Sequence, residues 1–184
     1  MPIASRLLQV LTIAAFTGIA MPWAMASLVR AMDLAALTTE ADQIVVGEVL
    51  SSASAWDGGH RNIYSAIEIG VQESWKGVLP ASGKIRIRQL GGTVGQVEMT
   101  VLGMPRFAPG ERALVFLRHE QVVGMAQGKR HIRWDPTSSH WMVDAPDRAG
   151  LLKTQLHRNP GSPEPSQGET LELLREKVRA LVGN

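Results

Sequence analysis

Apolar and polar residues alternate with a period of two in several stretches of the chain, a pattern typical of β-strands with one buried face. The clearest case is Lys84 to Arg88, where basic residues alternate with isoleucines. The stretch from Asn62 to Trp75 alternates in the same way over a longer span. Gln43 to Leu50 is dense in β-branched residues, and Gly47 within it indicates a bulge or a close backbone approach. We therefore predict three strands in the first half of the chain.

The second half contains shorter apolar stretches separated by glycine, proline and serine. Ala113 to Leu117 is uniformly apolar, which predicts a strand buried on both faces. Further short strands are predicted at Val97–Leu102, Val122–Ala126, His131–Trp134 and His140–Val143. Many short strands that do not alternate with helices indicate a mainly β fold, a barrel or a sandwich.

Two glycine-containing segments are predicted to connect these strands. Ser51 to Arg61 is small and polar with a glycine pair, which favours a turn between the first two strands. Gly91 to Gly95 could be read as a phosphate-binding loop, but no helix follows it, so we expect a flexible connector instead.

Helices are predicted at the two ends of the β region. Met32 to Asp42 is rich in helix formers and should pack as a short N-terminal helix. Ser166 and Glu169 have the spacing of a capping box, and a C-terminal amphipathic helix is expected over 169–184. Its apolar stripe consists of Leu171, Leu174, Val178 and Leu181. We expect this helix to dock on its own domain, the alternative being that it binds another molecule.

The first 26 residues resemble an export signal. Arg6 supplies a positive charge, Leu7 to Ala20 form a largely apolar run, and Ala24 to Ala26 offer a small-x-small cleavage pattern before Ser27. An uncleaved anchor is the alternative, but the run is shorter than the roughly 20 apolar residues that a membrane span needs. We predict cleavage between Ala26 and Ser27, contact with the membrane only during export, and a periplasmic or secreted mature protein.

The predicted organisation is therefore a signal peptide (1–26), one β domain (27–158), a Pro-rich linker (159–168) and a helix (169–184). The chain has no cysteine among its 184 residues, which excludes disulfides, thiolate zinc sites and a cysteine nucleophile. Its net charge of +2 does not suggest a nucleic-acid partner. The basic residues Lys84, Arg86 and Arg88 are expected to be a solvated strand face.

Four motifs together resemble a known family. They are ADQIVVGEV (Ala41–Val49), YSAIEIGVQESWKG (Tyr64–Gly77), KIRIRQ (Lys84–Gln89) and GMPRFAPGERALVFL (Gly103–Leu117). In this order they resemble the netrin-like barrels that include the tissue inhibitors of metalloproteinases, and similar exported bacterial proteins. The resemblance covers Leu34 to Trp134 and implies a five-stranded Greek-key barrel related to the oligonucleotide/oligosaccharide-binding (OB) fold.

One departure from that family bears on function. In the metalloproteinase inhibitors an N-terminal cysteine places its α-amino group and carbonyl on the catalytic zinc. Here the predicted mature N-terminus is Ser27 and no cysteine exists, so the inhibitory mechanism does not carry over. What remains is the expectation of an exported binding barrel, an analogy at the level of fold.

Two groups of residues are candidate binding sites. Trp56, His60 and Arg61 lie in a glycine-containing turn that can form a recognition tip, unless Trp56 folds back over the barrel. The second group can stack a sugar or hold an anion, unless its tryptophans pack against the C-terminal helix. It consists of Arg130, Arg133, Trp134 and Trp141.

Catalytic motifs are lacking in the sequence: there is no G-x-S-x-G elbow, H-E-x-x-H helix, P-loop or Rossmann fingerprint. A metal site would require His131 and His140 to converge with Asp135 or Asp144, and we favour surface histidines instead. We predict no cofactor and a non-enzymatic binding or accessory function toward another extracytoplasmic protein. The alternatives are a glycan- or anionic-polymer-binding barrel and, third, a metal-dependent hydrolase built around the two histidines.

Overall fold

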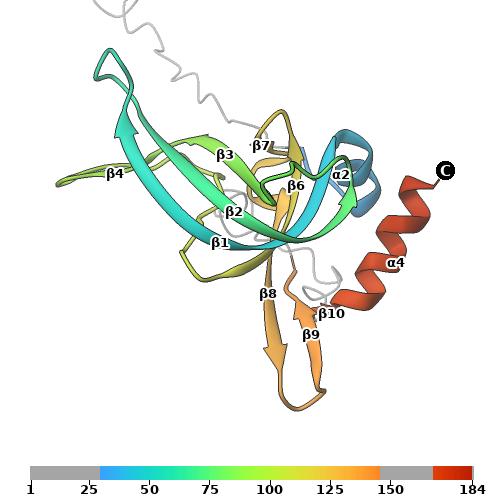
Figure 1. Ribbon diagram of the computed structural model, residues 1–184. Helices are drawn as coiled ribbons and strands as arrows, with labels where there is room; N and C mark the ends of the chain where they lie inside the picture. Colours follow the sequence, from blue (N-terminus) through green and yellow to red (C-terminus); the bar gives the residue numbers. More distant parts are fainter. Residues whose placement is uncertain (1–29, 146–167, 184) are drawn as a thin grey trace, which may run out of the picture.

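The computed structural model describes residues 30–145 and 168–183, which form a mainly β protein with two helices (Figure 1). Eight antiparallel strands make one sheet, whose path is β10-β9-β8-β6-β1-β2-β3, with β7 also paired to β6. The predicted signal peptide, its cleavage site at Ala26–Ser27, and the predicted linker up to residue 167 lie outside the described residues. No helix of the described part is long and apolar enough to span a membrane.

The longest strands are β1 (Gln43–Trp56) and β2 (Ile63–Lys76), which pair along their full length as one curved hairpin. The predicted turn at 51–61 is therefore wrong in its extent, because residues 51–56 continue β1. Residues 51–55 are small and largely exposed, so they carry no apolar period. Pairing with residues 63–68 of β2 holds them extended instead.

The sheet continues through β3 (Lys84–Leu90) on β2 and through β6 (Arg112–Arg118) on β1. As predicted, Lys84, Arg86 and Arg88 are exposed while the isoleucines between them are buried. The residues Ala113 to Leu117 are at most 1 % exposed, which confirms a strand buried on both faces. The short strand β7 (Gln121–Val122) follows β6, and the Arg88 amide donates to the Glu120 carbonyl just before it at 3.2 Å.

Two predictions about the middle of the chain are wrong in part. Within the expected connector 91–95, β4 (Gly92–Val94) pairs with β5 (Val97–Met99) as a separate ribbon, since Gly95 with a φ of 60° permits a tight turn. In the expected strand 122–126, only the first residue belongs to β7. Gly124 takes the left-handed conformation and starts the short 3-10 helix η1 (Met125–Gly128).

The strands predicted near residues 131–134 and 140–143 exist as β8 (Lys129–Asp135) and β9 (His140–Val143). They form an antiparallel hairpin that projects from the body of the molecule (Figure 1). The two-residue strand β10 (Glu169–Thr170) pairs with β9 and leads directly into the last helix.

Both predicted helices are present, as α2 (Leu34–Glu40) and α4 (Leu171–Val182). The N-cap of α4 is Thr170 rather than the predicted Ser166: its side chain accepts a hydrogen bond from the Leu173 amide at 3.3 Å. The helix docks on its own domain, as expected, through residues that are at most 1 % exposed: Leu171, Leu174 and Val178. Leu181, the fourth residue of the predicted stripe, remains 39 % exposed.

Apolar residues form a core on each face of the sheet. One core lies between the sheet and the two helices, with Phe116, Leu37 and Leu174 among its members. The other lies on the opposite face of the same curved strands, with Val115, Ile67 and Ile87 among its members. Because β1 and β6 contribute alternate residues to both cores, the helices and strands form one unit.

Candidate functional site

The β8–β9 hairpin carries the second group of predicted site residues. Trp134 on β8 lies directly opposite Trp141 on β9 in the strand register. Their ring centroids are 5.4 Å apart and the ring planes meet at 66°, an edge-to-face arrangement. The two rings therefore support each other but do not form one flat surface.

The two tryptophans differ in their surroundings. Trp141 packs against the core that includes α4, and the Arg112 guanidinium lies over its ring at 4.4 Å from the centroid. Trp134 is 49 % exposed. The expectation of packing near the C-terminal helix thus fits Trp141. Trp134 instead exposes about half of its surface to solvent while its ring packs against Trp141.

Charged side chains fix the same hairpin near its root. Asp144 accepts from Arg133 Nε at 3.1 Å, and its other oxygen lies 3.2 Å from His131 Nδ1. Arg130 points elsewhere: its side chain is 10 % exposed and approaches Glu169 of β10 at 3.6 Å. Arg133 is exposed like Trp134, but as its neighbour in β8 it points to the opposite face of the hairpin. Arg130 helps to attach β10.

The tip of the hairpin is ordered by Asp135. Its carboxylate accepts from the Ser138 hydroxyl at 2.8 Å and from the Thr137 amide at 3.0 Å. The Ser138 hydrogen bond, followed by the Thr137 amide, holds the pKa of Asp135 below its ordinary value. The Asp135 carboxylate therefore accepts hydrogen bonds from its own turn and stabilises it.

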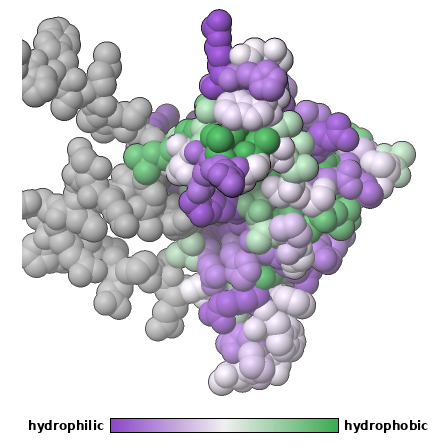
Figure 2. All heavy atoms as spheres, turned by 90° about the vertical axis from the view of Figure 1, so that its left-hand side faces the viewer, coloured by the Kyte–Doolittle hydropathy of each residue, from purple (hydrophilic) through white to green (hydrophobic). Residues whose placement is uncertain are grey.

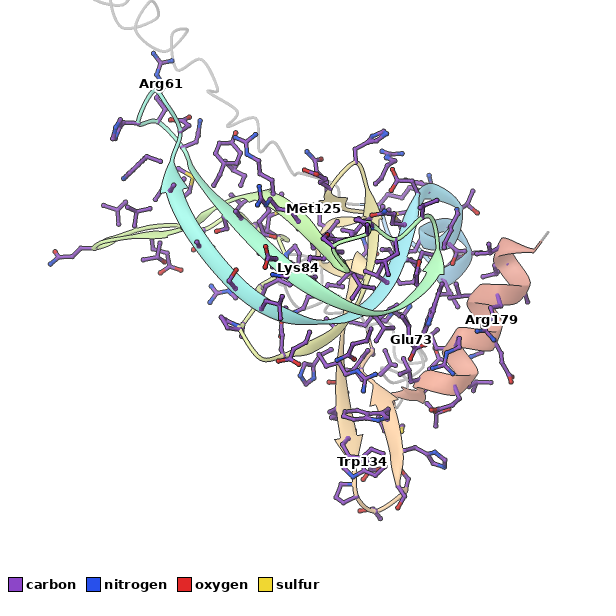
Figure 3. All side chains as sticks on the ribbon, in the orientation of Figure 1. Arg61, Glu73, Lys84, Met125, Trp134 and Arg179 are labelled. Carbon is purple, nitrogen blue, oxygen red and sulfur yellow. The ribbon has the colours of Figure 1, made fainter. Side chains whose placement is uncertain are left out.

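The first group of predicted residues occupies the tip of the β1–β2 hairpin. Trp56 is the last residue of β1 rather than a loop residue, is half-buried, and stacks on His60 with centroids 6.0 Å apart. Asp57 accepts from the Arg61 amide at 2.8 Å, and this hydrogen bond is the largest cause of its lowered pKa. Figure 3 shows Arg61 and Trp134 at opposite ends of the molecule, so the two groups are separate.

The histidines that a metal centre would need do not converge. His131 lies at the root of the β8–β9 hairpin beside Asp144, whereas His140 pairs with Asp135 at its far end. Within residues 30–145 and 168–183 no group of three His, Asp or Glu side chains could hold a metal ion.

Arg112 contributes to the tryptophan pair, although the sequence did not indicate it. It begins β6, about 30 positions before Trp141, and only the sheet order places its side chain on that ring. No periodicity or motif in the sequence signals such a contact.

Comparison of the chain with known protein families, with curated proteins and with solved structures finds no match. The resemblance to netrin-like barrels therefore stays a prediction. The function has to be argued from the geometry of the hairpins and of the sheet.

Proposed function

We propose that this chain is an exported, non-enzymatic binding domain that contacts another extracytoplasmic protein through the β8–β9 hairpin. The observation that carries the proposal is the half-exposed ring of Trp134 on a projecting hairpin. This ring packs edge-to-face against Trp141. The export rests on the predicted signal peptide.

A fixed tryptophan suits a protein interface for an energetic reason. Binding residues that dominate affinity are enriched in Trp, Tyr and Arg, and each immobilised side chain costs about 0.5–1.5 kcal/mol of ordering on binding. Trp134 is already positioned by Trp141. Little of that cost is left for the complex, so a partner with an apolar pocket for the ring gains affinity.

We also infer that β1, β2, β3, β7 and β6 close into a barrel of the OB type. The Arg88–Glu120 backbone hydrogen bond joins β3 to the turn between β6 and β7. All five strands point side chains into one cluster, with Val122 of β7 packed against its edge. Further backbone hydrogen bonds between β3 and β7 in an experimental structure would support closure, and a water-filled gap between these strands would contradict it.

The alternative functions receive less support. A glycan platform of Trp134 and Trp141 would need coplanar rings, whereas the two planes meet at 66°. A hydrolase site at His131 and His140 would need the two side chains on one cavity, whereas they lie at opposite ends of the hairpin.

The test is affinity capture from the native extracytoplasmic fraction with the tagged mature protein and its Trp134→Ala variant. We expect the wild type to retain one specific protein. The affinity of this partner for the variant should be at least about 30-fold lower, the effect of losing about 2 kcal/mol at an interface anchor. Melting temperatures check that the variant is folded.

Trp56→Ala is the matched control, since it removes a tryptophan from the opposite hairpin. It should retain the partner. Equal loss in both variants, or loss in Trp56→Ala alone, would contradict the assignment to the β8–β9 hairpin.

A further inference from the structure

A groove of about 390 Å³ lies between the β4–β5 ribbon and the β1–β2–β3 part of the sheet, away from the β8–β9 hairpin. Figure 2 turns to the viewer the side on which β4 projects in Figure 1, where hydrophilic and hydrophobic side chains are mixed. The volume is within the range of about 300–1,000 Å³ that is usual for small-molecule sites. Five hydroxyl side chains line the groove: Ser52, Ser54, Ser65, Thr93 and Thr100.

The inner wall of the groove offers hydrogen-bond acceptors. The Ser65 hydroxyl donates its single hydrogen to the Gly91 carbonyl at 2.7 Å, so Ser54 is the donor in the 2.9 Å contact between the two hydroxyls. The lone pairs of the Ser54 oxygen remain for a ligand. Gly92 lies against this pair so closely that a Cβ there would be 2.3 Å from the Ser54 oxygen.

Gln89 adds a second acceptor, which is buried and has no hydrogen-bond donor among the described residues. Its amide nitrogen donates to the Pro105 carbonyl at 3.0 Å, while its Oε1 is buried and accepts no hydrogen bond from any described residue. Leaving a buried acceptor unpaired is energetically unfavourable. Because Gln89 lines the groove, a ligand there can donate to this oxygen once a small rotation of the side chain uncovers it.

The other lining groups define the class of ligand. Glu98 and Arg106 approach each other at 3.9 Å, so the groove has no uncompensated positive charge that would select an anion. Met104 and Phe107 supply apolar surface. Hydroxyl edges and apolar ring faces are combined in sugars. We propose that this groove binds a neutral saccharide of one or two rings, independently of the protein contact at the β8–β9 hairpin.

The experiment is NMR titration of the ¹⁵N-labelled mature protein with maltose, cellobiose, sucrose and diacetylchitobiose, each to about 20 mM, several-fold above a millimolar Kd. Trialanine is titrated in parallel. At least one sugar should shift the amide signals of Gln89 and Gly91 to Thr93. Absence of shifts with all four sugars, shifts confined to Trp134 and Trp141, or tighter binding of trialanine would overturn the proposal.

Gln89→Leu should lower the affinity for the sugar that binds by at least about tenfold, because it removes roughly one hydrogen bond. Gln43→Leu is a matched control, because Gln43 also donates its amide nitrogen to a backbone carbonyl, that of Val78, at 3.0 Å but lies outside this groove. It should leave affinity unchanged. Thr93→Val, on an exposed residue, should weaken binding without affecting folding. Wild-type affinity in both Gln89→Leu and Thr93→Val would also refute the site.

Discussion

At the scale of single residues, Gly47 shows a backbone requirement that the sequence already signalled. The register of β1 against β2 shifts between Val46 and Gly47, as a bulge would produce. A Cβ at Gly47 would lie 2.4 Å from the Gly70 carbonyl oxygen and 2.6 Å from Ile69 Cγ2. The predicted close approach is thus confirmed, and glycine is required here because the neighbouring backbone occupies the space.

Gly47→Ala should therefore destabilise the fold by about 1–3 kcal/mol, the usual cost of overpacking a tight site. Gly58→Ala is the matched control, because a Cβ there meets nothing within 4 Å. Its effect should stay within about 0.5 kcal/mol. Urea unfolding of the two variants measures the difference, and equal stabilities would show that β1 can move away from β2 at little cost.

At the scale of elements, α4 is held by both apolar and charged contacts. The Arg175 guanidinium makes two hydrogen bonds of 2.9 Å with the Glu73 carboxylate on β2. Figure 3 shows Glu73 beside α4. Leu174 is fully buried, whereas the adjacent Leu173 is 46 % exposed. The amphipathic pattern predicted the buried face, but it did not predict Glu73 as a partner, which is 102 positions away in the chain.

Leu174→Ala should lower the free energy of unfolding by about 2–5 kcal/mol, because it leaves a cavity between α4 and the sheet. Leu173→Ala makes the same chemical change on the same helix and should cost less than about 0.5 kcal/mol. Chemical denaturation followed by circular dichroism compares them. Similar losses in both variants would mean that α4 does not dock as described.

At the scale of the whole molecule, helices and strands share the two cores, so the chain should unfold as one unit. Three partly exposed carboxyls nevertheless add a pH dependence, since Asp57, Glu68 and Asp135 all have lowered pKa values. Their main causes are the Arg61 amide for Asp57, the hydrogen bond from Lys84 for Glu68, and the Ser138 hydroxyl for Asp135.

A carboxyl with a lowered folded-state pKa stabilises the fold above its unfolded pKa and loses this contribution as the pH falls through the folded value. The double variant Asp57→Asn/Asp135→Asn should thus melt below the wild type at pH 7, and the difference should shrink between about pH 5 and pH 3. Thermal melts at these pH values test it. A difference that grows toward acid pH would give the wrong sign.

The sequence by itself determined the mainly β class, the positions of most strands and the two terminal helices. These follow from local periodicity, as in Lys84 to Arg88 and in Ala113 to Leu117, which reports directly which faces are buried. Only the tertiary structure decided that residues 51–56 extend β1, that Arg112 covers Trp141, and that the two candidate sites lie at opposite ends of the molecule. Each of these depends on strand pairing between residues far apart in the chain, and pairing leaves no local pattern when the residues are small, polar or exposed.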